Sequence, residues 1–557
     1  MKKFKSIAIL FVTLALLLSG CTSTTKVHEE TIPPHDNIAF KDMKYQRPDI
    51  DATNQKIEDL IKLSQNSNKE ADVLNAYQDI LDDLYNIDYM SSLANIFYSI
   101  DVTSQYYDNE SQFLSNSYTK LDNQMNSLTK TILESQYKDA FTNKMGQDFI
   151  ERYQKNAKLN SPEIEELSEQ EIALVNQYNT LLSKEYTTEI KGKTVTMDDL
   201  DFSKQDDIDA YYHIYQNKNK ELATIYSQLV KIRIQIAKKL GYDSYADYAY
   251  DVLGRDFTKE DAQKFEKSVL ETVTPLYLSL SMKYQNKISQ LDKTPYSLES
   301  GISYLEDALK KEFPQAMQEA LTYMQKYQLY HFSNDKNTQH AGFTTLLGSS
   351  PFMFINANDY KTPDTVFHEF GHYYNFYLMG KTIWNDSNNL DIAEIHSQGL
   401  ELLMFKYYQD IFKDDAQLFE VNSIIEMLSS IIQGAAEDEF QQKVYENPDM
   451  SIDEMNALHA QISKKYYGYE MTYEWVDIHH HFESPFYYIS YATSAVSALE
   501  IWMLSQQDRD EAILTYRNMT QNTINVDYLD ALKNANLSNP FTSQIIQEIA
   551  KQIKKDF

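Results

Sequence analysis

One short motif limits what this chain can fold into. Residues His368 to His372 read His-Glu-Phe-Gly-His, so two histidines stand four positions apart and a glutamate follows the first. On an α-helix, positions i and i+4 lie one above the other, so both imidazoles can reach a single metal ion. Glu369 then lies beside that ion. The motif therefore predicts a helix here, one face of which can bind a divalent cation.

The flanking residues indicate where this helix begins and ends. Thr362 suits the N-cap, and Pro363 suits the first helical position, which needs no backbone N–H. Gly380 suits the position just after the C-terminal end. Gly371, inside the helix, costs about 1 kcal/mol relative to alanine. Its missing side chain would let another backbone approach the metal-binding face.

A catalytic zinc site takes three protein ligands and leaves one position open. Glu394 is the best third ligand, on a second predicted helix where Ser397 and Glu401 share its face. Glu401 is placed to accept the second N–H of a zinc-bound histidine. Two alternatives without a metal site stay open at this point. One is a surface helix with solvated histidines at positions 368 and 372, and the other is a solvated glutamate at position 394.

The HExxH motif followed by Glu394-x-x-Ser397-x-x-x-Glu401 resembles the M3 family of zinc metallopeptidases, the group of thimet oligopeptidase and oligoendopeptidase F. The resemblance extends over residues 200–545 and is strongest over 366–401. It implies a mainly α fold, with two helical lobes around a deep substrate channel and a small β element beside the active-site helix.

The same resemblance implies a zinc-dependent endopeptidase that acts on short peptides. It assigns His368, His372 and Glu394 as the ligands of one Zn²⁺ per chain. Glu369 would be the general base, and Glu401 would accept a hydrogen bond from a zinc-bound histidine without touching the metal. A non-catalytic peptide- or zinc-binding lipoprotein is the alternative, and a structural lipoprotein that merely inherited the fold is a further one.

A second informative stretch, residues 475–494, holds three consecutive histidines and several tyrosines. Adjacent side chains point in different directions, so these histidines are poorly placed to bind one ion together. Peptide hydrolysis builds negative charge on the carbonyl oxygen, which Tyr O–H or His N–H groups stabilise. By likeness to the M3 family, His481, Tyr488 and Tyr491 face the substrate, and so does His480.

Two short β elements are predicted among the helical patterns. Residues 186–197 read as a hairpin with a glycine in its loop. Residues 351–356 form an apolar run typical of a strand. Two interpretations of this strand remain: an edge strand that pairs with the substrate backbone, as in zincins, or a buried core strand.

The N-terminus reads as an export signal. A basic start, Met1 to Lys5, precedes an apolar segment too short to span a bilayer comfortably. The residues Leu18-Ser19-Gly20-Cys21 then resemble the bacterial lipoprotein box, which implies cleavage before Cys21, lipidation of this cysteine and attachment to the outer face of the cytoplasmic membrane. A plain signal peptide or an uncleaved anchor is the alternative.

Composition favours a helical protein and argues against nucleic-acid binding. The net charge is −31, whereas nucleic-acid binding needs a basic surface. Only 13 Gly and 12 Pro occur, which favours long helices over many turns. The domains expected from these patterns are a signal peptide, a tether, an N-terminal helical domain and a catalytic domain, over residues 1–20, 21–45, 46–200 and 201–557.

Overall fold

The computed structural model describes residues 31–557, apart from 67–68, 160, 292, 294–295, 385, 387–388 and 522. Residues Pro33–Phe557 form one compact unit. The predicted signal peptide and the predicted lipidation site, Cys21, lie outside the described residues. Within the described residues, no helix has both the length and the apolar character needed to cross a membrane.

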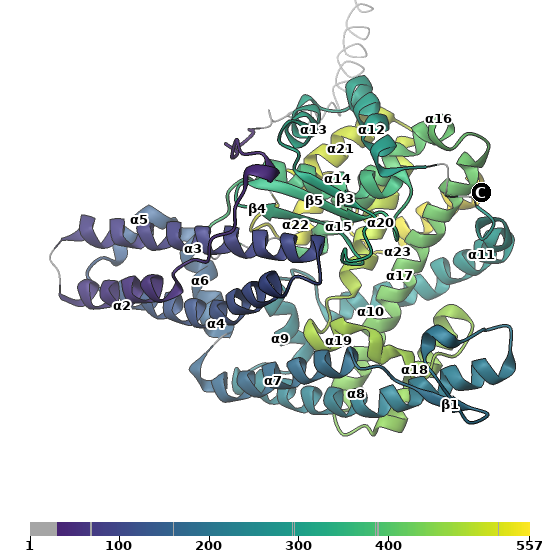
Figure 1. Ribbon diagram of the computed structural model, residues 1–557, viewed down its shortest axis with the longest axis horizontal. Coiled ribbons are helices and arrows are strands. Elements are labelled where there is room, and N and C mark those ends of the chain that lie inside the picture. Colours follow the sequence, from purple (N-terminus) through teal and green to yellow (C-terminus); the bar gives the residue numbers. More distant parts are fainter. Residues whose placement is uncertain are drawn as a thin grey trace, which may run out of the picture. The chain divides into compact units, whose positions relative to one another are not determined.

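The N-terminal helices form a bundle with its own apolar core (Figure 1). Val73, Tyr77 and Ile80 recur at helical spacing along one face of α3, and all three are buried in this core. The elements of this part are η1 (Phe40–Asp42), α2 (Ile50–Asn66), α3 (Glu70–Ile100), α4 (Gln105–Leu133), α5 (Lys138–Met145) and α6 (Gln147–Leu159).

The middle of the chain is also helical, with the predicted hairpin after α7. Strands β1 and β2 pair antiparallel, and the loop between them places Gly192 at φ +79°, where a side chain would be strained. The elements are η2 (Pro162–Ile164), α7 (Glu165–Leu182), β1 (Thr188–Ile190), β2 (Lys193–Val195), η3 (Met197–Asp199), α8 (Gln205–Lys239), α9 (Tyr245–Val252), α10 (Lys259–Ser268), η4 (Val269–Val273), α11 (Thr274–Ile288), α12 (Leu298–Glu312) and α13 (Gln315–Tyr327).

A three-stranded mixed sheet precedes the HExxH helix. It consists of β3 (Tyr330–Ser333), β4 (Gly342–Leu347) and β5 (Ser350–Asn356), in the order β3-β5-β4. The predicted strand over 351–356 is confirmed as β5, which is buried along its whole length at the centre of the sheet. The core-strand interpretation therefore holds, and the edge-strand interpretation is wrong for β5. The edge strand beside the HExxH helix is β4.

The C-terminal part is helical and carries the HExxH motif on α14 and Glu394 on α15. The elements are α14 (Pro363–Met379), α15 (Leu390–Leu403), η5 (Met404–Tyr407), α16 (Tyr408–Phe412), η6 (Lys413–Asp415), α17 (Ala416–Glu446), α18 (Ile452–Tyr467), η7 (Glu474–Asp477), α19 (His479–Glu483), α20 (Ile489–Ser505), α21 (Arg509–Thr520), α22 (Tyr528–Asn534) and α23 (Ser543–Asp556).

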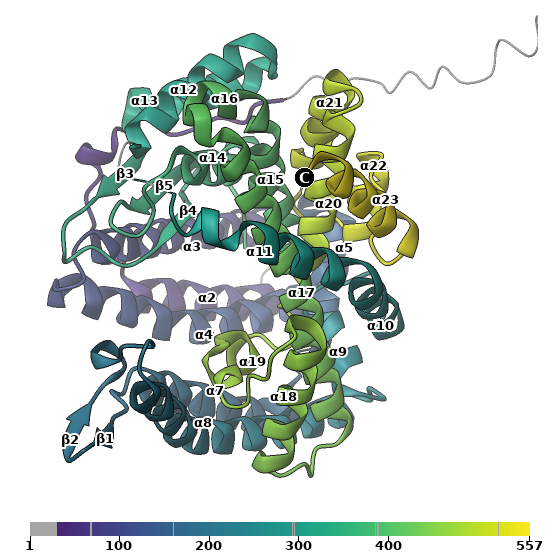
Figure 2. The ribbon, with the colours of Figure 1, turned by 90° about the vertical axis from the view of Figure 1, so that its right-hand side faces the viewer.

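The mainly α fold predicted from the sequence is confirmed, and its helices form two groups. In both ribbon views, α7, α8 and α18 lie on one side of the molecule and α12 to α16 lie on the other (Figures 1 and 2). The long helix α17 runs from one group toward the other (Figure 2). The HExxH helix belongs to the second group, where it packs against α12, α15 and the sheet.

Residues 33–43 pack on the second group as a strap. The His35 ring stacks on Tyr377 at 4.2 Å, and its Nδ1–H donates to the carbonyl oxygen of Ser349 over 2.7 Å. Phe40 packs on Phe352 of β5 at 4.3 Å. The prediction of a free tether up to residue 45 is therefore wrong for this stretch, because aromatic side chains hold it against the strands and α14.

Candidate metal centre

The helices α14 and α15 cross at a glycine. A Cβ built on Gly371 would lie 2.2 Å from the carbonyl oxygen of His396, so only glycine allows this approach. The Tyr516 hydroxyl donates to the same carbonyl oxygen over 2.8 Å, which fixes α15 from its other side. The expectation that Gly371 admits a neighbouring backbone is confirmed, and this contact brings Glu394 toward the two histidines.

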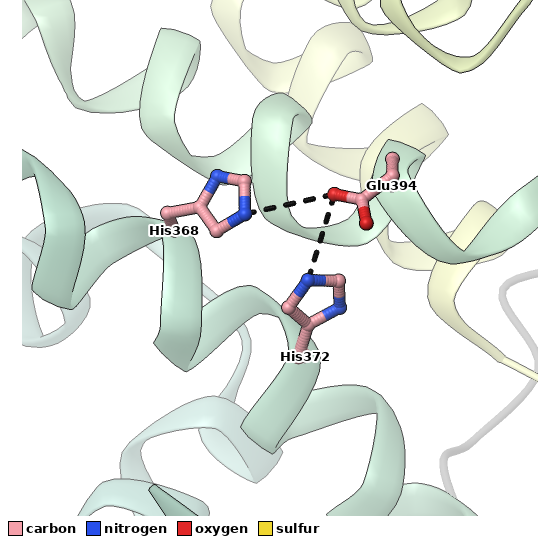
Figure 3. A group of neighbouring side chains, drawn as sticks. All are labelled: His368, His372 and Glu394. Atoms are coloured by element: carbon pink, nitrogen blue, oxygen red, sulfur yellow. Dashed lines mark ion pairs between the residues drawn. The ribbon is translucent and has the colours of Figure 1, made fainter. Parts of the chain in front are cut away.

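Three predicted ligands converge at this crossing (Figure 3). Oε2 of Glu394 lies 3.6 Å from Nε2 of His368 and 3.6 Å from Nε2 of His372. Ligand atoms of all three residues lie within 4.8 Å of one another. The side chains are partly exposed, with 29% of His368 and 18% of Glu394 accessible, so a solvent molecule can reach the point they surround.

Neighbouring side chains hold these ligands in place. Oε2 of Glu401 lies 3.5 Å from Nδ1 of His368, as expected for a partner of a ligating imidazole. The Ser397 hydroxyl donates to Oε2 of Glu394 over 2.9 Å. These contacts orient the ligand atoms of His368 and Glu394.

The electrostatics of the cluster favour positive charge at its centre. Burial alone would lower the pKa of His368, but the three surrounding carboxylates outweigh it and raise the pKa to about 9. Burial would raise the pKa of Glu394, but the imidazoles and the Ser397 hydroxyl lower it to about 2. A carboxylate held ionised beside two imidazoles suits a divalent cation.

The donor set fits zinc. Tetrahedral Zn²⁺ with bonds of about 2.0–2.1 Å requires ligand atoms about 3.3 Å apart, close to the observed 3.6 Å. Two histidines and one glutamate are also the ligands of known catalytic zinc sites, which keep a fourth position open. Among the residues that the structure describes, this is the one group of His, Cys, Asp and Glu side chains with such spacing.

The carboxylate of Glu369 points into a cavity of about 750 Å³ that also contains His368. Oε2 of Glu369 accepts a hydrogen bond of 2.7 Å from the hydroxyl of Thr344 on β4. Sequence reasoning missed Thr344, since nothing in its local pattern distinguishes it from other strand threonines. The acidic residues lining the cavity outnumber the basic ones by five to two: Asp359, Asp364, Glu369, Glu401 and Glu426 against Lys293 and Lys361.

Three of the residues predicted to face the substrate form an aromatic cluster. The rings of Tyr488 and Tyr491 lie 5.1 Å and 5.8 Å from that of His480. Tyr487, which the sequence analysis did not select, lies 5.2 Å from the same ring. Burial is the main cause that raises the pKa of Tyr487 and Tyr491, and the Glu394 carboxylate contributes. Both hydroxyls therefore stay protonated and can donate hydrogen bonds.

His481 occupies a different environment from the one expected. Its side chain is completely buried, and its Nε2 lies 3.3 Å from Oε2 of Glu437. Arg233 donates to its carbonyl oxygen over 2.9 Å. The expected role of His481 as a donor to the substrate is therefore wrong for this arrangement. The short helix α19 turns successive side chains apart, so His480 faces the tyrosines while His481 faces the core.

A buried ion pair joins the ligand helix to the tyrosine segment. The Arg255 guanidinium donates to both carboxylate oxygens of Asp391, in the first turn of α15, over 3.2 Å. It also donates to the Ser490 hydroxyl over 3.0 Å, and that hydroxyl donates to Asp391. Sequence reasoning missed this contact because its members lie 136 and 99 positions apart.

Comparison with known proteins points to peptidases. Residues 40–160 match the Peptidase M3 N-terminal domain, although the resemblance noted in the sequence began near residue 200. An oligoendopeptidase F homologue of Borreliella burgdorferi is 24% identical over 230 residues, which span 37% of this chain and 39% of the relative.

The fold is shared with solved peptidases. PZ peptidase A superposes with a TM-score of 0.75 at 23% identity, over 93% of this chain and 98% of the other. An oligoendopeptidase F of Bacillus anthracis gives a TM-score of 0.73 at 23% identity with the same coverage. The chain therefore contains a segment, residues 40–160, that matches the Peptidase M3 N-terminal domain, and it shares its fold with solved peptidases that include PZ peptidase A.

Proposed function

We propose that this chain is a zinc-dependent endopeptidase that hydrolyses short peptides outside the cytoplasmic membrane. One observation carries the proposal: two imidazoles and a carboxylate surround one point, and a further carboxylate, that of Glu369, lines a cavity together with one of these imidazoles, His368. The aligned relative and the superposed structures are peptidases by name, which supports the same reaction class.

Each side chain of the site has a separate role in the proposed mechanism. Zn²⁺ bound by His368, His372 and Glu394 would act as a Lewis acid on the scissile carbonyl and lower the pKa of water. Glu369 takes a proton from the attacking water and delivers it to the leaving amine. Hydroxyl donors from Tyr487 and Tyr491 would stabilise the negative charge that develops on the carbonyl oxygen.

Peptides are the substrate class that suits the cavity. Strand β4 is the edge of its sheet, so its outer backbone groups can pair with an extended peptide. A cavity of about 750 Å³ holds a short peptide segment and excludes a folded domain. The channel expected between the helical lobes would impose the same limit on length.

A peptide- or zinc-capturing lipoprotein is the second candidate. Capture needs the ligands but no general base, whereas here Glu369 is held by a hydrogen bond within the same cavity. This arrangement favours hydrolysis.

Digestion of a peptide library tests the proposed function. Purified protein with zinc should cut peptides internally, as read by mass spectrometry. A chelator should stop the cleavage, and added zinc should restore it. Stoichiometric zinc without any cleavage would instead support the capturing lipoprotein.

We further propose that Cys21 carries a lipid that holds the enzyme at the outer face of the membrane. Replacement of Cys21 by Ser should abolish incorporation of a labelled fatty acid and shift the protein from the membrane fraction to the medium. Unchanged membrane attachment of the variant would favour an uncleaved anchor instead.

A further inference from the structure

We propose that Thr344 is a positioning residue that orients the carboxylate of Glu369 for proton transfer. This inference rests on the proposed function, but it concerns a residue outside the HExxH motif and on a different element. It assigns the two carboxylate oxygens different tasks: Oε2 is held, and Oε1 exchanges the proton.

The hydroxyl of Thr344 lies within hydrogen-bonding distance of two oxygen atoms of Glu369. The Thr344 hydroxyl lies 2.7 Å from Oε2 of Glu369 and 3.1 Å from the carbonyl oxygen of the same residue. Its single proton can be donated to either acceptor. Because a hydrogen bond to a charged acceptor is stronger than one to a neutral acceptor, the carboxylate is the preferred partner.

The strand that carries Thr344 is itself fixed. Thr344 pairs with Met353 of β5, and β5 is buried along its whole length. Strand β4 also packs against α14, which carries Glu369. The position of the hydroxyl is therefore set by the sheet and not by the helix it contacts.

The other carboxylate oxygen is free for chemistry. Within the part of the chain that the structure describes, Oε1 of Glu369 accepts no hydrogen bond from protein groups. The nearest strand position is Gly342, where a built Cβ would lie 3.6 Å from Oε1. With Oε2 held, Oε1 stays beside Gly342, which lines the same cavity as Glu369, and such positioning is a large part of catalysis.

Three single substitutions test the role. Thr344→Val keeps the shape of the side chain and removes the donor. Thr344→Ser keeps the donor. Thr345→Val is the matched control, because Thr345 is next on the same strand, pairs with Phe352 and has its side chain on the opposite face.

We expect Thr344→Val to lower kcat by about 10- to 100-fold, because the general base loses its fixed orientation. KM should stay within about twofold, since the hydroxyl acts on the base and not on substrate binding. Zinc content should stay at one per chain, and the melting temperature should fall by less than about 3 °C. Thr344→Ser and Thr345→Val should keep kcat within about threefold of the wild type.

Other outcomes overturn the inference. A Thr344→Val protein with wild-type kcat removes any role in positioning. A Thr344→Ser protein as defective as Thr344→Val shows that a hydroxyl at this position does not by itself support catalysis, so the loss cannot be assigned to the hydrogen bond. Loss of zinc or a large fall in melting temperature in Thr344→Val, with Thr345→Val unaffected, would make Thr344 a structural residue of the β4–α14 contact.

A double-mutant cycle with Glu369→Asp checks the partner. Aspartate draws the carboxylate back by one methylene, out of reach of Thr344. If the two residues act together, Thr344→Val should change kcat by less than about twofold in the Glu369→Asp background. Fully additive losses would overturn the inference. An inactive wild-type enzyme would overturn the proposed function as well, whereas an active wild type matched by Thr344→Val overturns the inference alone.

Discussion

Glu369 is the single side chain on which the proposed chemistry depends most. Replacement by Gln keeps its size and removes its ability to accept a proton. We expect Glu369→Gln to lower kcat/KM by about 10²–10⁴-fold, the usual contribution of a general base. Zinc content should be unchanged, because Glu369 lies outside the group of ligands. Assays with a quenched peptide and metal analysis of the same preparation provide both values. Wild-type turnover by this variant would remove Glu369 from the mechanism.

The ligands and their supporting residues should differ in the size of their effect on metal binding. Glu394→Ala removes one of three ligands and should leave the purified protein without stoichiometric zinc. Ser397→Ala removes only the hydrogen bond of 2.9 Å to Glu394, so it should weaken zinc binding by about 10- to 100-fold. Competition with a chromogenic chelator measures both. Equal zinc affinity in Glu394→Ala and the wild type would show that the metal binds elsewhere.

At the scale of elements, the crossing of α14 and α15 sets the geometry of the site. A Cβ at position 371 would lie 2.2 Å from a backbone oxygen, which cannot move without the helix that carries it. Gly371→Ala should therefore push the helices apart, with loss of zinc and a melting temperature several degrees lower. Gly399→Ala is the control on α15, since its Cβ meets the Tyr516 ring at 3.1 Å. It should retain zinc. Gly371→Ala with normal zinc content would contradict this account.

Contacts between residues close together in the sequence were predicted, whereas contacts between residues far apart in the sequence were not. The spacing of His368 and His372 follows from helix geometry, and Gly371 marked the crossing in advance. Thr344 and Arg255 were missed because they reach the site through tertiary packing, which no local pattern records. The edge strand β4 was missed because its residues, apart from the buried Leu347, are all about half-buried and lack a clear alternation. His481 was misplaced because α19 is one short turn whose direction depends on Arg233 and Glu437.

At the scale of the whole molecule, charge should govern which peptides arrive fastest. The net charge is −31, and five acidic residues line the cavity against two lysines. A peptide with several Lys or Arg should therefore lose about three- to tenfold in kcat/KM between low salt and 0.5 M salt, because screening weakens its attraction. An uncharged peptide of the same length should change little. An identical salt response of both peptides would show that the charge does not steer substrates.

The buried contact of Arg255, Asp391 and Ser490 limits the opening motions that are available to the enzyme. It fastens α15, which supplies the Glu394 ligand, to α20, which carries Tyr491 of the aromatic cluster. Separating these two helices would leave a buried charge without a partner, which costs several kcal/mol. Opening to admit a peptide must then carry α15 and α20 as one rigid piece. A hinge would have to lie elsewhere, so the ligand and the tyrosine hydroxyls keep their alignment through every cycle of entry and release.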